Sequence, residues 1–116
     1  MHYPYYRPRR FRRTENLRRM IRETVLTVDQ LIYPLFVLPG RDAKIPVKSM
    51  PGVYQLSADR LLDELQSVAS LHIPGILLFG LPSNKDEIGS EAFAEDGVVQ
   101  QAVKAIKDKF PDLVVI

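Results

Sequence analysis

Charged side chains that could act as a nucleophile and as acid–base groups gather in one predicted loop. Lys85, Asp86 and Glu87 lie within residues 81–95, directly after the apolar run 75–80. In α/β folds the working residues follow the carboxyl ends of strands. Lys85 is then a candidate amine nucleophile, with Asp86 or Glu87 as its acid or base partner. The competing interpretation is that these three residues are solvated charges in a long loop. It is the favoured one, because they are adjacent in sequence and nothing in the sequence shows that they converge.

A second, weaker set of charges follows the predicted strand 31–38, at Arg41, Asp42 and Lys44. Neither His2 nor His72 has a partner at metal-ligand spacing. The glycines are too scattered for a phosphate-binding loop. The sequence has no cysteine, which excludes a disulfide, a thiolate zinc site and a cysteine nucleophile within it.

The first 22 residues are strongly basic. They hold eight arginines, and prolines and tyrosines in residues 1–13 favour an extended arm over a helix. Arginine with interleaved tyrosine suits nucleic-acid binding, through phosphate contacts and base stacking. It equally suits contact with a second subunit, where arginines pair with carboxylates. Composition alone leaves both alternatives open, and the rest of the chain is acidic on balance.

The elements that would position these side chains alternate between strand and helix. Apolar residues spaced three and four apart predict helices, and short apolar runs predict strands. Thr14, Ser57 and Asp96 are predicted N-caps, and His72 stands where glycine often ends a helix. Because proline cannot donate to the strand ladder, Pro34 is compatible with a strand only at a sheet edge, at a bulge or at the start of the strand. The predicted helices are 15–23, 58–71 and 97–109, the predicted strands are 31–38, 75–80 and one starting at 113, and 39–51 is a predicted loop.

This α/β alternation is typical of a doubly wound sheet or a (β/α)₈ barrel, with 75–116 as a parallel βαβ unit. Three strands are too few for either fold, so we expect a truncated piece that stops within its last strand. One apolar sheet face should then lack cover and make the chain marginally stable. Either Leu35, Val37, Leu77 and Phe79 or the residues alternating with them should lie on that face.

Bulk composition narrows the class of protein. A chain of 116 residues, 46% hydrophobic and 26% charged, is typical of one small globular domain. No apolar run is long enough to span a membrane. No apolar segment follows the basic start as it would in a secretory signal. We expect a cytoplasmic location.

The sequence resembles the N-terminal third of the porphobilinogen synthase family, also called delta-aminolevulinic acid dehydratase. Each matching stretch is weak alone, but together they cover nearly the whole chain in family order. They are residues 7–10 (RPRR), 17–24 (LRRMIRET), 31–37 (LIYPLFV), 50–57 (MPGVYQLS), 73–74 (IP), 78–80 (LFG), 85–86 (KD), 89–91 (GSE) and 110–116 (FPDLVVI).

The resemblance implies a (β/α)₈ TIM barrel with an N-terminal arm that wraps a neighbouring subunit in an octamer or hexamer. Residues 1–23 would be the arm with its short helix. Residues 24–116 would be the first two βα units and the start of the third strand. It also implies a lyase that condenses two molecules of 5-aminolevulinate to porphobilinogen in haem biosynthesis. A non-enzymatic RNA-binding module that uses the basic arm is the alternative.

Few functional residues carry over from the family. Its two Schiff-base lysines, its first catalytic aspartate and its metal-binding segment, for zinc or magnesium, match no position here. We therefore assign no catalytic, cofactor-binding or metal-binding residue, and expect these residues alone to be inactive and metal-free. No nucleic-acid or membrane partner is expected. The resemblance favours subunit contact through Arg7, Arg9, Arg10, Arg12 and Arg13.

Overall fold

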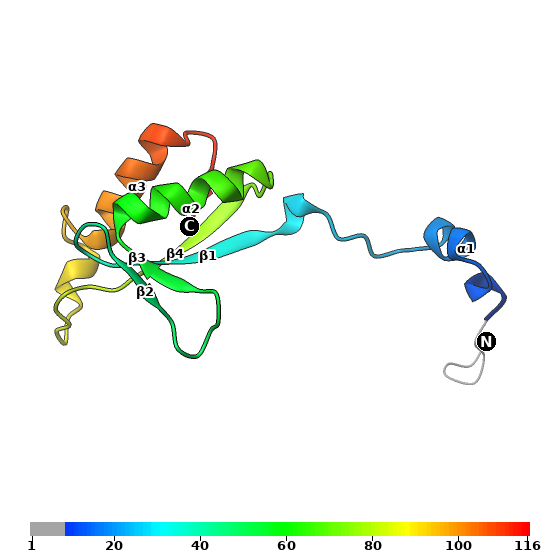
Figure 1. Cartoon of the computed structure of the whole chain (residues 1–116), viewed down its shortest axis with the longest axis horizontal. Helices are drawn as coiled ribbons and strands as arrows, with labels where there is room; N and C mark the ends of the chain where they lie inside the picture. The colour runs from blue at the N-terminus through cyan, green and yellow to red at the C-terminus, as the bar shows by residue number, and fades with distance from the viewer. Residues whose placement is uncertain (1–8) are drawn as a thin grey trace.

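The computed structural model describes residues 9–116 as an N-terminal arm followed by an α/β body (Figure 1). Its elements, in chain order, are η1 (Arg9–Arg12), α1 (Glu15–Met20), η2 (Val28–Gln30), β1 (Ile32–Val37), β2 (Lys44–Pro46), β3 (Tyr54–Leu56), α2 (Ala58–Ser70), β4 (Gly75–Gly80), η3 (Ser90–Ala92), α3 (Val98–Lys109) and β5 (Val114–Val115). None of the helices within this part of the chain has the length and apolar character needed to cross a membrane.

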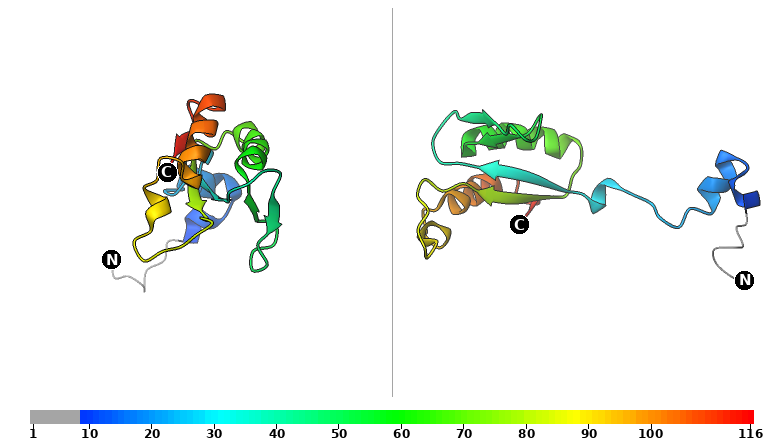
Figure 2. Two further views of the ribbon diagram at one scale, coloured as in Figure 1. Left: turned by 90° about the vertical axis from the view of Figure 1, so that its left-hand side faces the viewer. Right: turned by 90° about the horizontal axis from the view of Figure 1, so that it is seen from below.

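The body is a five-stranded sheet in the order β2-β3-β1-β4-β5. β4 pairs in parallel with β1 on one side and with β5 on the other, so 75–116 forms the predicted parallel βαβ unit. The helices α2 and α3 lie side by side on one face of this sheet (Figures 1 and 2). The α/β alternation expected from the sequence is therefore confirmed.

The core lies between the two helices and the sheet. α2 contributes Leu61, Leu65 and Val68 to it, and α3 contributes Ala102 and Ile106. These residues recur at helical spacing and pack on Leu35, Val37, Leu56, Ile76 and Leu78 of the strands. Burying aliphatic side chains in this layer is the main favourable contribution to folding the body.

The opposite face of the sheet is apolar and has no helix on it. Phe36 and Phe79 lie directly opposite each other there, with ring centroids 5.4 Å apart. Ile32, Phe79 and Val114 each expose 45% or more of their surface. One uncovered apolar face was expected, and the structure confirms it.

The register decides which residues occupy that face. Leu35 is opposite Leu78, and paired residues in a parallel sheet point to the same side. Leu35 and Val37 therefore lie under the helices, whereas Leu77 and Phe79 lie on the open face with Phe36. The four residues Leu35, Val37, Leu77 and Phe79 therefore do not share one face. On the open face, β4 contributes Leu77 and Phe79, whereas β1 contributes the residues that alternate with Leu35 and Val37.

The predicted loop 39–51 contains a strand that the sequence analysis missed. β2 (Lys44–Pro46) pairs antiparallel with β3 (Tyr54–Leu56), and β3 pairs in parallel with the end of β1. Each partner is only three residues long, and one contains a proline. Neither has the periodicity that marks a strand in sequence, because their pairing comes from tertiary contact.

Pro34 lies in a central strand without breaking its ladder. Backbone groups alternate along a strand, and Leu38 N donates to Leu56 O at 2.9 Å, on the β3 side. The position of Pro34, four residues earlier, faces the same side. Pairing with β3 begins only at Phe36, so the missing N–H of Pro34 has no strand partner to lose.

The predicted helix caps meet three different outcomes. Thr14 is confirmed, since its Oγ1 accepts a hydrogen bond from Leu17 N at 3.2 Å. Ser57 precedes α2 as predicted, but its buried hydroxyl accepts from Ala43 N at 2.9 Å instead of capping the helix. The prediction that Asp96 is an N-cap is wrong, because Gly97 is the residue that precedes α3.

Helix ends also differ from prediction by small amounts. The helix predicted over 15–23 ends at Met20, and α2 ends at Ser70, one residue early. α3 begins at Val98, one residue later than predicted, and a Cβ on Gly97 before it would lie 2.6 Å from Glu91 O. The close approach of the loop backbone thus requires glycine at that position.

His72 ends α2 in a left-handed conformation, with φ of 57°. Ile73 N donates to Val68 O and His72 N to Ala69 O, the two bonds of a Schellman motif. Glycine adopts this conformation without the steric cost that a Cβ incurs. The prediction that His72 occupies a glycine-like position is confirmed.

His72→Gly should therefore raise the free energy of unfolding of the protein by about 1 kcal/mol, by relieving left-handed strain. Urea denaturation measures the change. His72→Ala is the control, because it removes the imidazole and keeps the Cβ. Equal gains in both variants would show that backbone strain is not the cause.

Candidate functional site

The carboxyl ends of β1 and β4 bring two loops to one edge of the sheet (Figure 1). The loop after β1 runs through residues 38–43, and the loop after β4 through residues 81–97. Their neighbouring positions follow from the parallel pairing of the two strands. Both sets of charges singled out in the sequence therefore lie at this edge.

The loop after β1 is tied to the start of α2. Asp42 has a left-handed φ of 54°; its N–H donates to Asp59 at 2.9 Å and its carboxylate accepts from Arg60 Nε at 2.6 Å. Hydrogen bonds from the Ser57 hydroxyl and from Asp42 N–H lower the pKa of Asp59. Asp42, Asp59 and Arg60 are exposed, so their charges fix loop geometry and add little stability.

The other two charged residues of this region do not converge on Asp42. Lys44 places its ammonium 4.3 Å from the centre of the Tyr54 ring, a cation–π contact within the β2–β3 hairpin. Arg41 is exposed. The structure therefore brings together no catalytic constellation after β1.

In the loop after β4, Asp86 closes a turn. Its carboxylate accepts from Ser90 N at 2.8 Å and from the Ser90 hydroxyl. Both bonds lower the pKa of Asp86, and the one from the hydroxyl contributes more than the one from the N–H. A carboxylate held ionised in this way is a poor general acid.

A cavity of about 530 Å³ lies under this loop. Gly80 and the first residues of α3 form its floor, and a Cβ on Gly80 would lie 2.5 Å from the Val99 side chain. Lys85 and Asp86 line the cavity, and Glu87 does not. Glu91, from the matching stretch 89–91, also lines it, as do Asn84 and Gln100, which no motif in the sequence singled out.

The cavity does not make Lys85 a nucleophile. An amine that forms a Schiff base needs desolvation or a cationic neighbour to lower its pKa. Lys85 is exposed to solvent, and the residue that follows it in the chain is the carboxylate Asp86. Of the two interpretations of Lys85, Asp86 and Glu87, the geometry favours solvated loop charge, with Asp86 also ordering the turn.

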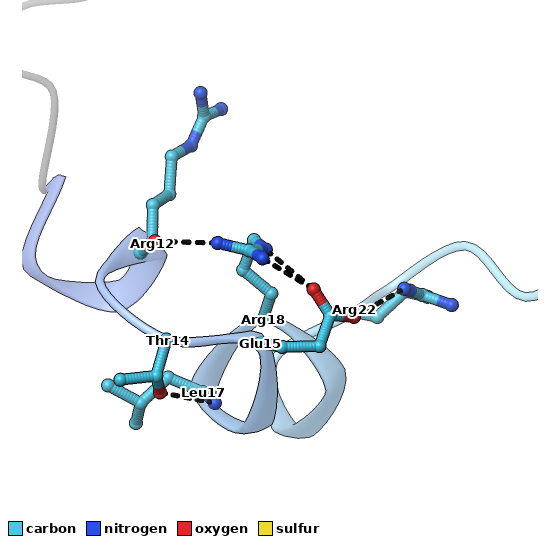
Figure 3. A network of polar contacts seen from close by, with 6 residues as sticks. All are labelled: Arg12, Thr14, Glu15, Leu17, Arg18 and Arg22. Carbon is cyan, nitrogen blue, oxygen red and sulfur yellow. Dashed lines mark hydrogen bonds and ion pairs between the residues drawn. The ribbon is translucent and has the colours of Figure 1, made fainter.

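The arm has its own polar network (Figure 3). Arg18 donates to Glu15 through Nε at 3.1 Å and to Arg12 O at 2.9 Å, and Arg22 lies 3.9 Å from Glu15. Within residues 9–116, Arg9, Arg12, Arg13 and Arg19 have no carboxylate partner. Arg7 lies outside the described residues.

The described residues do not form a cluster of side chains that could hold a metal ion. No three His, Asp or Glu side chains come together within residues 9–116. A structural zinc site needs four protein ligands in tetrahedral geometry.

Residues 5–116 match the family model described as delta-aminolevulinic acid dehydratase. A curated relative of that description from Synechocystis sp. is 54% identical over 114 residues, which are 98% of this chain and 35% of the relative. One from Halalkalibacterium halodurans is 51% identical, over 97% of this chain and 34% of the relative. The chain thus spans about a third of the length of these relatives.

A solved structure gives the same picture. The crystal structure of delta-aminolevulinic acid dehydratase from Toxoplasma gondii ME49, in complex with the reaction product porphobilinogen, superimposes with a TM-score of 0.89. Sequence identity is 34%, over 95% of this chain and 32% of that one. The fold therefore corresponds to one part of a TIM barrel.

The turn at Asp86 yields a prediction about titration. Ser90→Ala removes the hydroxyl donor, so the pKa of Asp86 should rise toward its ordinary value; carboxyl NMR chemical shifts against pH measure it. Because folding lowers this pKa, the turn's stabilisation is present above the unfolded pKa and lost as pH falls through the folded value. Ser83→Ala, in the same loop without a carboxylate contact, should leave the titration unchanged. An unshifted midpoint in Ser90→Ala would contradict the assignment.

Proposed function

The chain belongs to the delta-aminolevulinic acid dehydratase family, and on that premise we propose that the protein it is part of is a porphobilinogen synthase. This lyase condenses two molecules of 5-aminolevulinate to porphobilinogen with loss of two waters. The observation that carries the proposal is the family match over residues 5–116, together with a fold that superimposes on a product complex of that enzyme.

Residues 24–116 supply scaffold to this proposed enzyme. β1, β4 and β5 would form three adjacent strands of the barrel, with α2 and α3 outside it. The apolar face bearing Phe36 and Phe79 would then be covered within the barrel. Both Schiff-base lysines and the zinc or magnesium ligands that the resemblance implies would come from beyond these strands, since no described residue fits those roles.

We also propose how the protein assembles and where it is located. Residues 1–23 would form a subunit-contact arm in a homo-octamer or hexamer, through Arg7, Arg9, Arg10, Arg12 and Arg13. The radius of gyration supports an arm, since 20.9 Å far exceeds the roughly 13 Å of a compact domain of this length. A cytoplasmic location and the absence of a nucleic-acid partner stay predictions.

The activity is tested on the full-length protein with 5-aminolevulinate. We expect porphobilinogen to form, and borohydride reduction to attach substrate covalently to lysine. The 116-residue chain alone should give no stoichiometric adduct, because every lysine within residues 9–116 is exposed to solvent. Mass spectrometry of both proteins measures this. A single-site adduct on Lys85 would overturn the assignment of that residue as loop charge.

The arm is tested by deleting residues 1–13 from the full-length protein. Sedimentation should show smaller assemblies, with lower activity, because the basic contact to a neighbour is lost. Deleting residues 1–6 is the matched control, since it keeps all eight arginines. An unchanged mass after the longer deletion would contradict subunit contact. Salt-sensitive RNA binding by the arm would favour the RNA-binding alternative.

A further inference from the structure

Two oppositely charged segments stand at opposite ends of the molecule. Residues 9–22 of the arm hold seven arginines and one acidic residue, Glu15. Residues 86–96 of the loop after β4, here called the acidic loop, hold five carboxylates and no basic side chain. The longest dimension of the molecule is 59 Å, and the arm and the acidic loop lie at its two ends (Figures 1 and 2). Residues 9–22 therefore do not contact the acidic loop of the same chain.

The acidic loop has a fixed conformation before any partner binds. Asp86 accepts two hydrogen bonds from Ser90, and Glu91 accepts from Asn84 N at 3.1 Å. Gln100 of α3 donates to Ala92 O at 2.7 Å. A surface already ordered in this way loses little conformational entropy on binding.

The same loop presents groups that the fold itself does not use. Ile88 and Phe93 expose 76% and 70% of their surface. Glu87, Glu95 and Asp96 are exposed, and within residues 9–116 no basic side chain pairs with them. Exposed apolar groups ringed by charge mark interaction surfaces.

The arm offers the complementary groups. Phe11, Met20 and Ile21 are exposed by 40%, 81% and 46%, beside arginines that have no carboxylate partner in the described chain. An arm with so little internal burial gains its order from contact with another surface. Its positive charge and apolar side chains match the carboxylates and the apolar pair of the acidic loop.

Other acidic positions fit the arm less well. On α2, Asp63 lies 3.6 Å from Arg60 and Glu64 accepts from Tyr33. Asp108 lies between Lys107 and Lys109, which offset its charge. The open face of the sheet is apolar and presents no carboxylate along β1 and β4.

We propose that the acidic loop, residues 86–96, is the docking surface for the arginine-rich arm of a second copy of the chain. Arginines of that arm pair with Glu87, Glu95 and Asp96, and its apolar side chains cover Ile88 and Phe93. This rests on the proposed subunit contact and adds the surface that receives it. Each copy has one arm and one acidic loop, so reciprocal exchange closes a two-fold pair.

Charge reversal in the full-length protein tests the pairing. Glu87→Lys with Glu95→Lys, and separately Arg9→Glu with Arg13→Glu, should each raise the protein concentration at which the assembly dissociates by roughly tenfold or more. Combining both pairs should restore much of the assembly, because the charges are then exchanged. Asp108→Lys with Asp112→Lys is the control and should leave the mass unchanged. Sedimentation across a concentration series measures all four.

A cross-link supplies a readout independent of charge and of activity. A photoreactive benzoylphenylalanine in place of Phe93 should attach to residues 9–22 of another copy, located by mass spectrometry. Cross-links to other residues would overturn the inference. So would a Glu87→Lys, Glu95→Lys protein that keeps the same assembly mass as the Asp108→Lys, Asp112→Lys control. If only the arm variant dissociates, the arm docks on another surface and the proposed function stands. If the arm variant loses RNA binding while keeping its mass, the arm serves RNA instead.

Discussion

The parallel pairing of β1 with β4 is the constraint on which the rest of the structure depends. Its register sets Leu35 opposite Leu78 and Phe36 opposite Phe79. The first pair lies under α2 and α3 and the second on the open face. One slipped residue would exchange these faces, since side chains alternate along a strand. The core, the open face and the edge that carries the loops all follow from this register.

The same pairing explains why the charged loops meet and why they do not form a catalytic site. Parallel strands end at one edge, so the segments after β1 and β4 are neighbours. There, however, the side chains are used for loop geometry: Asp42 bonds to Arg60 and Asp86 to Ser90. Solvent reaches all of them, and the lysines of the described chain are exposed as well.

The arm and the body follow different physical rules. The body is organised by burial of aliphatic side chains between helices and sheet. The arm has a capped helix, one carboxylate shared by Arg18 and Arg22, and apolar side chains that face solvent. Exposed ion pairs of this kind contribute little stability in water. An arm with no fully buried side chain among residues 9–22 is consistent with a segment that completes its contacts on another chain.

Sequence by itself determined the elements whose signal is local. Apolar spacing located α2 and α3, short apolar runs located β1 and β4, and the position of His72 before Pro74 located a left-handed helix end. Tertiary structure alone decided the β2–β3 hairpin, the use of the Ser57 hydroxyl on Ala43, and Gly97 in place of Asp96 before α3. It also decided which alternating set of β1 is buried. The hairpin, the Ser57 contact and the buried set of β1 depend on partners whose positions are fixed only when the strands pair and the helices pack. Gly97 is required by the close approach of the loop backbone at Glu91.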